Sequence, residues 1–537
     1  MRCSLFLTVP FVAIHTVAAG DDSAPVVISI DERIEHRLAA ERVEAVPLVD
    51  ESTFLRRVTL DLAGRIPTVA EWRSFLKSES PHRREELVDQ LVASPDFAFH
   101  LRNEIDQLLL ARIAADAEWR TYLLQAAREN RDWGQLFREI MLPEQQRPGD
   151  PGARAFLRHR ANDVDAMTND TSALLFGVNI SCARCHDHPL VSDWRQDHYF
   201  GMASFFNRTY RAKTGFVGER FEGQLEFTTT DGDQQTAKLM FLTGVTVEES
   251  GPEREADALR ELAEKIKQAL KKDDAETPPL PEFSPRNEFV RLALESPQPS
   301  HFARNMVNRV WARLLGRGLV HPLDQMHSEN PSGHPELLDD MAVGFAASGY
   351  DLRKLIRTIV LSRVYARSSG WSDGEPPSAE LFACGQVRPL TPLQLGLSLR
   401  IAAGNPERLR GLTAGEEWSA RREQLETQAN GLASRFEGPT DGFQVGVDEA
   451  LFLSNSSQIE TEILGNGDNS LVEFLIKQED DDRLIDAAFA VVLSRSATDI
   501  ERGAVLLYLA ERRDRPEDAV KQVVWSLLAS PEFRFNH

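Results

Sequence analysis

The segment Phe54-Leu-Arg-Arg-Val-Thr-Leu-Asp-Leu-Ala-Gly-Arg-Ile-Pro67-Thr68 indicates the class of fold. Its apolar residues form a dense face at helical spacing: Phe54, Leu55, Val58, Leu60 and Leu62. Pro67 ends this helical segment because proline has no backbone N–H to donate. Thr68 is suited to cap the next helix, since its hydroxyl accepts a hydrogen bond from a free N–H of the first turn. Residues from about 30 to 112 are therefore expected to be helical.

The same pattern returns in the second half of the chain, where Pro and Gly breaks separate apolar runs of helical spacing. The expected helices there are Phe289–Leu294, Phe302–Leu315, Pro335–Ala347, Leu352–Leu361, Pro392–Ala402, Glu449–Leu453, Leu484–Leu493 and Thr498–Ala510. Leu225–Phe241 differs, because two alternating runs flank Asp231-Gly232, which is a strong hairpin signal. The fold is thus predicted to be mainly α: two helical domains with a small β-hairpin insertion between them.

The chain has 537 residues, which is too long for one ordinary domain. Glu276 to Pro285 holds four prolines, follows a highly charged helical stretch and is the best candidate for a linker. We divide the sequence into a signal peptide (1–19), an N-terminal helical domain (20–212), the hairpin insertion (213–250), a charged helix with the Pro-rich linker (251–284), and a C-terminal helical domain (285–537).

The first nineteen residues have the features of a secretory signal peptide. Arg2 supplies a positive start, Leu5 to Val17 is a short apolar run, and Val17-Ala18-Ala19 offers small residues for cleavage. No later stretch approaches the ~20 apolar residues that a membrane span needs. We therefore expect an extracytoplasmic protein, periplasmic or secreted, without a membrane span.

The charge balance limits the classes of partner. With 61 Lys and Arg against 83 Asp and Glu, the net charge is -22. Such a surface repels the phosphate backbone, which argues against a nucleic-acid partner. No phosphate-binding loop, dinucleotide fingerprint or Gly-x-Ser-x-Gly motif is present. The oligomeric state does not follow from the sequence.

The sharpest chemical motif is Cys182-Ala-Arg-Cys185-His186, the pattern of covalent c-type haem attachment. Two thiols one turn apart can add to the two vinyl groups of a porphyrin, and the adjacent histidine then serves as the proximal iron ligand. These are the only paired cysteines expected after signal cleavage. The remaining one, Cys384, lies in an apolar context typical of a buried small residue.

The sixth ligand of the haem iron would bind on the face opposite His186. His188 is too close in sequence to reach that face easily, so this ligand must be water or a residue from elsewhere in the chain. His198 and Met202 are the nearest candidates in sequence, and Met167 precedes the motif. Asp187 is expected to accept a hydrogen bond from a ring N–H of His186 or His188. The residues expected to form an apolar wall are Trp194, Tyr199, Phe205 and Phe206.

Three other readings of the motif stay open: a Cys182–Cys185 disulfide, a free dithiol, and a zinc site made by Cys182, Cys185, His186 and His188. The first functional hypothesis is a redox or electron-transfer protein with a protein partner. The alternative is a non-catalytic extracytoplasmic scaffold in which this segment is a disulfide or zinc staple. His321, His327 and His334 lie with Asp324 and Glu329 in a second polar loop, where capping and turn roles are favoured over a metal site.

These motifs together resemble the planctomycete cytochrome-associated family that carries the domains of unknown function 1549 and 1553. The first domain is similar at Phe54–Thr68, at Leu87–Pro95 and at Phe176–Pro189, which contains the cysteine motif. The second is similar at Asn305–Val320, with Asn308, Arg309 and Trp311, and later at His334–Asp339, Leu390–Leu395 and Leu528–Phe533. The resemblance implies a mostly helical, two-domain exported protein in which the cysteine motif closes the first domain. Many relatives carry a separate cytochrome c domain in front, which this chain is expected to lack. The family's biochemical activity is not established.

Overall fold

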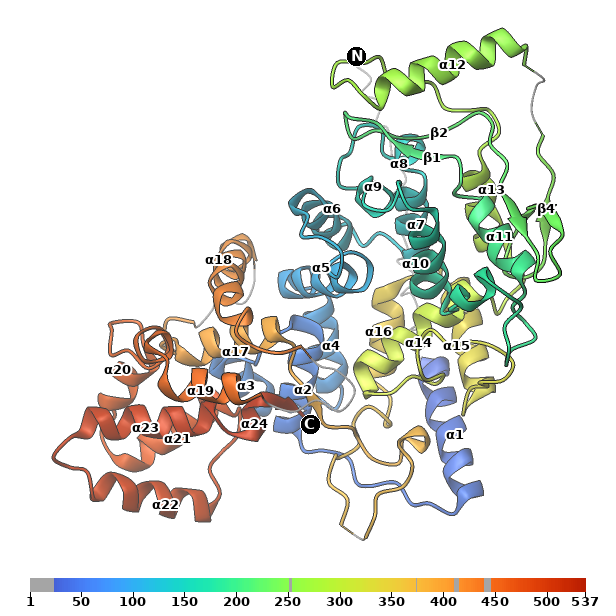
Figure 1. The fold of residues 1–537 in the computed structure, drawn as a ribbon. Helices are drawn as coiled ribbons and strands as arrows, with labels where there is room; N and C mark the ends of the chain where they lie inside the picture. The colour runs from blue at the N-terminus through green and yellow to red at the C-terminus, as the bar shows by residue number, and fades with distance from the viewer. Residues whose placement is uncertain (1–23, 251–253, 373, 410–414, 439–445) are drawn as a thin grey trace, which may run out of the picture.

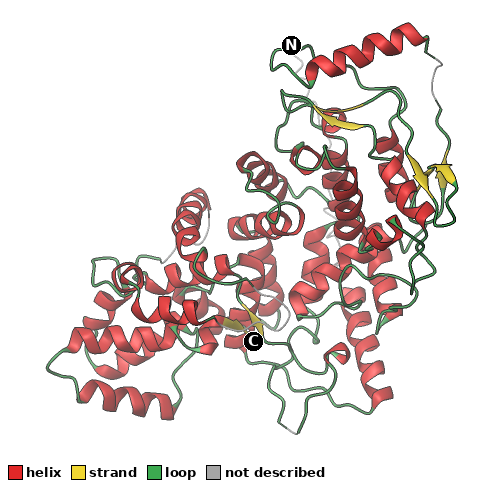
Figure 2. Cartoon of the chain, in the orientation of Figure 1, coloured by secondary structure: helices red, strands yellow, loops and turns green. Residues whose placement is uncertain are grey.

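The computed structural model describes residues 24–250, 254–372, 374–409, 415–438 and 446–537, and these are mainly helical (Figures 1 and 2). The predicted fold class is confirmed. The proposed signal peptide lies outside the described residues. Within the described ranges, no helix combines the length and the apolar character needed to cross a membrane.

The first part of the chain is a series of helices joined by short turns. They are α1 (Ala24–Glu41), α2 (Glu51–Ala63), α3 (Val69–Lys77), α4 (Arg83–Val92), α5 (Pro95–Leu109), α6 (Ala117–Arg128), α7 (Trp133–Met141), α8 (Pro143–Gln146), α9 (Ala155–Arg158), α10 (Val164–Phe176), the 3-10 turn η1 (Ser181–Arg184) and α11 (Gln196–Ser204). Thr68 caps α3 as predicted: its hydroxyl accepts from the Glu71 N–H at 3.3 Å. The Glu71 carboxylate accepts in return from the Thr68 N–H at 2.7 Å.

Small antiparallel hairpins follow, and the predicted one is among them. β3 (Glu226–Thr228) pairs with β4 (Gln234–Thr236), and Gly232 at the turn has a φ of +92°. That conformation is accessible to glycine at little steric cost. The flanking pairs are β1 (Thr209–Arg211) with β2 (Val217–Glu219), and β5 (Leu239–Met240) with β6 (Thr246–Val247). The charged stretch after them forms α12 (Ala256–Ala269).

The second half is again helical, and every helix predicted there is confirmed. The elements are α13 (Pro285–Glu295), α14 (His301–Leu315), α15 (Pro335–Ala347), α16 (Leu352–Val360), η2 (Ala379–Leu381), β7 (Arg388–Pro389), α17 (Pro392–Ala403), α18 (Gly415–Ala433), α19 (Val447–Asn455), the π-turn η3 (Ile459–Ile463), α20 (Leu471–Ile476), α21 (Asp481–Val492), α22 (Asp499–Ala510), α23 (Pro516–Leu528), α24 (Pro531–Arg534) and β8 (Phe535–Asn536). The expected helices did not include α18, α20, α23 or the short α24.

Buried apolar residues form two large cores. The first takes residues from Ile30 to Ala383 and the second from Leu390 to Phe533, with Leu60, Ile66 and Val69 added from the first part of the chain. The division of the sequence at 212, 250 and 284 stays a prediction. Packing nevertheless crosses 284, because Phe289 of α13 lies 6.0 Å from Phe137 of α7 and 5.7 Å from Phe176 of α10, ring centre to ring centre.

Charged residues of α2 are buried and bind the far end of the chain. Arg56 donates to the carbonyls of Val492 (3.2 Å) and Phe533 (3.3 Å). Asp61 accepts from Arg388 at 2.8 and 2.9 Å, from the Tyr365 hydroxyl at 2.7 Å and from Asn536 at 3.1 Å. In Figure 1 the C-terminus accordingly lies beside α2.

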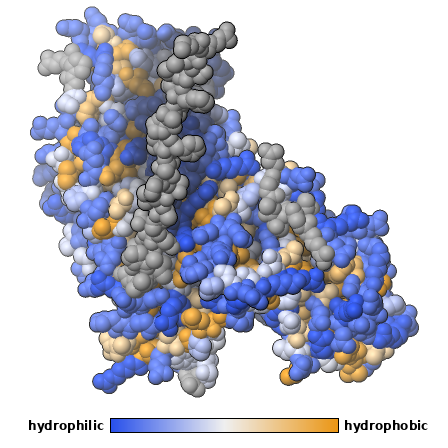
Figure 3. Space-filling model, turned by 180° about the vertical axis from the view of Figure 1, so that it is seen from behind, coloured by the Kyte–Doolittle hydropathy of each residue, from blue (hydrophilic) through white to orange (hydrophobic). Residues whose placement is uncertain are grey.

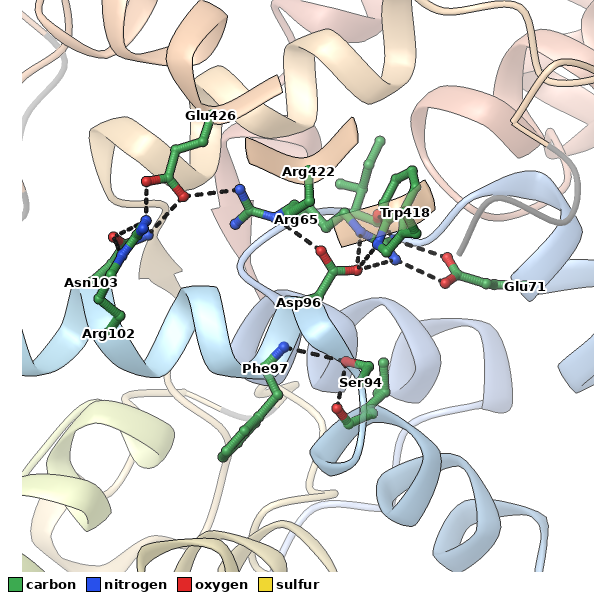
Figure 4. A network of polar contacts seen from close by, with 12 residues as sticks. Arg65, Glu71, Ser94, Asp96, Phe97, Arg102, Asn103, Trp418, Arg422 and Glu426 are labelled. Atoms are coloured by element: carbon green, nitrogen blue, oxygen red, sulfur yellow. Dashed lines mark hydrogen bonds and ion pairs between the residues drawn. The ribbon is translucent and has the colours of Figure 1, made fainter. Parts of the chain in front are cut away.

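Arg65, just after α2, starts a second buried network (Figure 4). Its guanidinium donates to Asp96 at 2.7 and 3.0 Å and to Glu71 at 2.9 Å. The Asp96 carboxylate also accepts from the Trp418 indole at 2.9 Å, and it pairs with Arg422 at 2.9 Å. Since Trp418 and Arg422 both lie on α18, Asp96 joins that helix to the start of α5.

The face shown in Figure 3 is largely hydrophilic, with apolar residues scattered among polar ones. This agrees with the excess of acidic residues in the sequence.

We predict that Asp96→Ala destabilises the protein by about 3 to 5 kcal/mol, because it leaves Arg65 and Arg422 buried without their shared carboxylate. Urea unfolding followed by circular dichroism measures the change. The matched control is Asp486→Ala, which removes an exposed carboxylate paired with Arg502 and is expected to cost far less, because water screens an exposed ion pair. Equal losses from the two variants would contradict the structural role of Asp96.

Candidate functional site

The cysteine motif lies in the loop between α10 and α11. Gly177 ends α10 with a φ of +70°, and a Cβ there would lie 2.9 Å from the Asn305 amide oxygen, so the close approach of α14 requires glycine. The turn η1 follows, closed by a bond from the Cys185 N–H to the Cys182 carbonyl (3.4 Å). Its residue Ala183 is buried, whereas Cys182 and Cys185 are exposed and, among the described cysteines, unbridged. The turn thus presents both thiols to solvent.

The ring of His186 is oriented by its own loop. Its Nδ1 lies 2.7 Å from the Asp187 carbonyl oxygen. A carbonyl oxygen only accepts, so Nδ1 carries the proton and Nε2 carries the free lone pair. Nε2 is therefore the atom ready to bind a metal, on an exposed side chain next to Cys185.

His188 and His198 are held in the opposite tautomer. The His188 Nδ1 accepts from the N–H groups of Leu190 (3.3 Å) and Val191 (3.1 Å). The His198 Nδ1 accepts from the Arg195 N–H (3.4 Å), and burial followed by the Arg195 charge lowers the pKa of His198. In both rings the proton of the neutral form then sits on Nε2. Neither ring is prepared to bind a metal through that atom in this arrangement.

Asp187 accepts the predicted hydrogen bond from the His186 ring, but through its main-chain carbonyl and not through its carboxylate. Its carboxylate accepts from the Gln196 N–H at 2.9 Å, at the start of α11, and its main-chain carbonyl is the group that orients His186. A helix N-terminus offers unpaired N–H donors and a positive field, which explains why the Asp187 carboxylate binds the start of α11 and not a histidine ring.

The expected aromatic wall is part of the protein core. Phe205 and Phe206 pack on Phe289 with ring centres 5.6 and 5.0 Å apart, and Met202 and Met167 are buried as well. The Tyr199 hydroxyl donates to Asp165 at 2.6 Å, and burial together with Asp165 raises the pKa of Tyr199. Met202 as an iron ligand stays a prediction. Its side chain is buried in the core, whereas the two thiols face solvent.

The second half of the chain forms the other side of this loop. The Asn179 N–H donates to the Asp324 carbonyl (2.8 Å), and the Met326 N–H donates to the Gly177 carbonyl (2.9 Å). The Asp193 carboxylate accepts from the N–H and the hydroxyl of Ser328, both at 2.8 Å. The loop with His321, His327 and His334 therefore lies against the cysteine loop, which the sequence analysis had not connected.

His301, at the start of α14, is a further neighbour that sequence reasoning missed. Its ring centre lies 6.3 Å from that of Trp194, which also contacts His198 at 5.9 Å. Burial and the Arg304 charge lower the pKa of His301 to about 4, so this imidazole is neutral at neutral pH. Nothing in the sequence marks this contact, because the two residues lie more than a hundred positions apart.

Two histidines of the neighbouring loop bind groups of their own part of the chain. His334 donates from Nε2 to the Glu380 carbonyl (2.8 Å), and His327 Nε2 lies 3.2 Å from the Gln325 amide oxygen. Across the part of the chain that the structure describes, no three His, Cys, Asp or Glu side chains are grouped so as to hold a metal ion. Cys384 is half-buried, and burial raises the pKa of its thiol.

Two models of known protein families match this chain, and each matched range contains one of the two loops described above. Residues 29–211 match PSCyt2, described as a protein of unknown function (DUF1549), and residues 285–435 match PSD1, described as a protein of unknown function (DUF1553). The chain belongs to the planctomycete cytochrome-associated family. The cysteine motif falls in the PSCyt2 range, and the loop that lies against the cysteine loop falls in the PSD1 range. No curated protein and no solved structure matches the chain.

We predict that Asp193→Ala weakens the contact between the cysteine loop of the first family domain and the Ser328 loop of the second. Two hydrogen bonds to Ser328 disappear, which corresponds to about 1 to 2 kcal/mol of local stability and roughly tenfold faster amide exchange. Hydrogen–deuterium exchange of peptides covering 186–194 and 326–330 measures this effect. Asp197→Ala is the control, because Asp197 is exposed four residues away. Equal exchange in the two variants would mean that the Asp193–Ser328 contact does not hold the loop.

Proposed function

We propose that this chain is an exported c-type haem protein that transfers electrons, with the haem attached through Cys182 and Cys185 and ligated by His186. The observation that carries the proposal is the contrast between the two neighbouring histidines. The hydrogen bond to the Asp187 carbonyl leaves the lone pair of His186 Nε2 free, whereas the bonds to His188 Nδ1 place the proton of that ring on Nε2.

The residues of the turn fit this group in other ways. Both thiols are exposed on one 3-10 turn, with Ala183 between them directed into the core. Arg184, the other intervening residue, pairs with Asp165 at 2.8 Å. Ala183 thus fixes the turn to the core, Arg184 fixes it to α10 at the surface, and the two thiols stay exposed. A bound haem would supply a one-electron couple between ferrous and ferric iron.

The geometry supports haem better than a zinc staple. A tetrahedral zinc site would need Cys182, Cys185, His186 and His188 to converge with a free lone pair on each ring. His188 uses its Nδ1 to accept two backbone N–H groups, so its recruitment would cost those bonds. Haem attachment needs only the two thiols and His186, and leaves the His188 turn intact.

Exposure of the motif also suits exchange of electrons with another protein. Leu190, four residues beyond His186, is 80% exposed. Single exposed apolar residues are ordinary on a surface. Because Leu190 lies five residues after Cys185 in the same loop, we assign it to the contact with a protein redox partner.

The first test is covalent attachment. The protein is expressed with its signal peptide in a host with active cytochrome c maturation, and the purified chain is denatured before a reduced-minus-oxidised spectrum is taken. We expect a haem band that survives denaturation and is absent from Cys182→Ala/Cys185→Ala. A colourless protein, in a host that matures a known cytochrome in parallel, would contradict the proposal and favour the scaffold function.

The second test separates the histidines. In His186→Ala the iron loses its proximal nitrogen, so we expect a shifted absorption spectrum that added imidazole restores. His188→Ala is the matched control and should keep the spectrum of the unaltered protein, because its ring binds backbone N–H groups only. The reverse pattern would show that His188 is the iron ligand.

A further inference from the structure

A separate cavity of about 880 Å³ lies in the C-terminal lobe, among α19, η3, α22 and α23. These elements follow residue 435 and so lie beyond both ranges matched by the family. Figure 1 shows α19, α22 and α23 together at one end of the molecule. Trp525 of α23 donates its indole N–H to the Leu453 carbonyl (2.9 Å), which fixes α19 against α23. The volume is in the range of sites for small ligands.

Most polar side chains of the cavity wall make no hydrogen bond or ion pair with the described part of the protein. Asn455 and Gln522 contribute amides, Glu460 and Asp518 contribute carboxylates, and Arg515 contributes a guanidinium. Among the described residues, none of these five side-chain groups makes a hydrogen bond or ion pair with another part of the protein. The wall thus offers exposed planar donors and acceptors, with charges of both signs.

The rest of the wall is apolar and aromatic. Tyr508 and Trp525 line it, and the Arg512 guanidinium lies 3.9 Å from the centre of the Tyr508 ring. Ile459 adds an aliphatic surface from η3, a π-turn, and such turns occur frequently at functional sites. Aromatic side chains beside hydrogen-bonding groups make a surface for a ligand that is part apolar and part polar.

We propose that this cavity binds an uncharged oligosaccharide. Neighbouring sugar hydroxyls each donate and accept, so a pair of them matches a planar amide, carboxylate or guanidinium, while the C–H faces of the ring pack on aromatic side chains. Glu460 and Asp518 outnumber Arg515, the cation of the wall without an ion pair, because Lys521 is paired with Glu517 at 2.8 Å, so the wall does not favour an anionic ligand. A purely apolar ligand would bury these polar groups without partners. The site is independent of the haem proposal, because it uses none of the same residues.

The test uses the full mature chain and isothermal titration calorimetry. The probes are the neutral hexasaccharides of glucose in α-1,4, β-1,4 and β-1,3 linkage and of β-1,4-xylose. Hexagalacturonate is the acidic comparison, and an uncharged hexapeptide of Ser, Asn and Gly is the peptide comparison. We expect at least one neutral sugar to bind and to bind more tightly than either comparison.

The variant Asp518→Ala/Gln522→Ala removes two exposed groups of the wall, and we expect about tenfold weaker binding from the loss of two hydrogen bonds. Glu423→Ala/Gln428→Ala on α18 is the matched control, with exposed residues of similar type outside the cavity, and should bind as the unaltered chain does. Absence of binding by all neutral sugars would overturn the proposal. So would tighter binding of the peptide or the acidic sugar, or equal binding by the two variants.

Discussion

The burial of charged side chains in and after α2 is the constraint on which the rest of the structure depends. Arg56, Asp61 and Arg65 are almost fully enclosed, and each binds groups that reach it from other parts of the chain. Removing a charge from water is costly unless its partners are in place, so each network requires its distant segments to be present. The partners of α2 include the final residues of the chain, and those of Arg65 include α18 through Asp96. The two cores are therefore held together by charge pairing as well as by apolar contact.

The surroundings of the cysteine motif are set by the packing of the first core. The first core takes residues from both domains of the family, and its packing brings α14 and the loop after it against the end of α10. The motif turn is then supported on two sides: Arg184 pairs with Asp165 of α10, and Asp193 binds Ser328 of the second domain. The thiols and His186 are left on the open side. A candidate site whose residues all lie in the first domain is thus bordered by the second domain.

Much of the fold is predictable because local chemistry determines it. The cap at Thr68 and the turn at Asp231-Gly232 follow from the residues at those positions, and the helices of the second half follow from apolar spacing. Helix α18 was missed because part of its buried face is charged: Arg422 and Glu426 are enclosed, although such residues are usually exposed. The tautomer of His186 and the position of His301 near the cysteine loop also could not be predicted from the sequence. Both depend on contacts that only the folded chain creates.

The central claim is that the turn of Cys182 and Cys185 carries a covalent haem. Intact-mass measurement of the mature chain, followed by mapping of the peptide that contains residues 182–186, tests it most directly. The account predicts a chain heavier by one haem, with the added mass on that peptide. A peptide lighter by two hydrogen atoms would show a disulfide instead, and a peptide of unaltered mass would show free thiols. Either result, in a host that attaches haem to another cytochrome, would contradict the account.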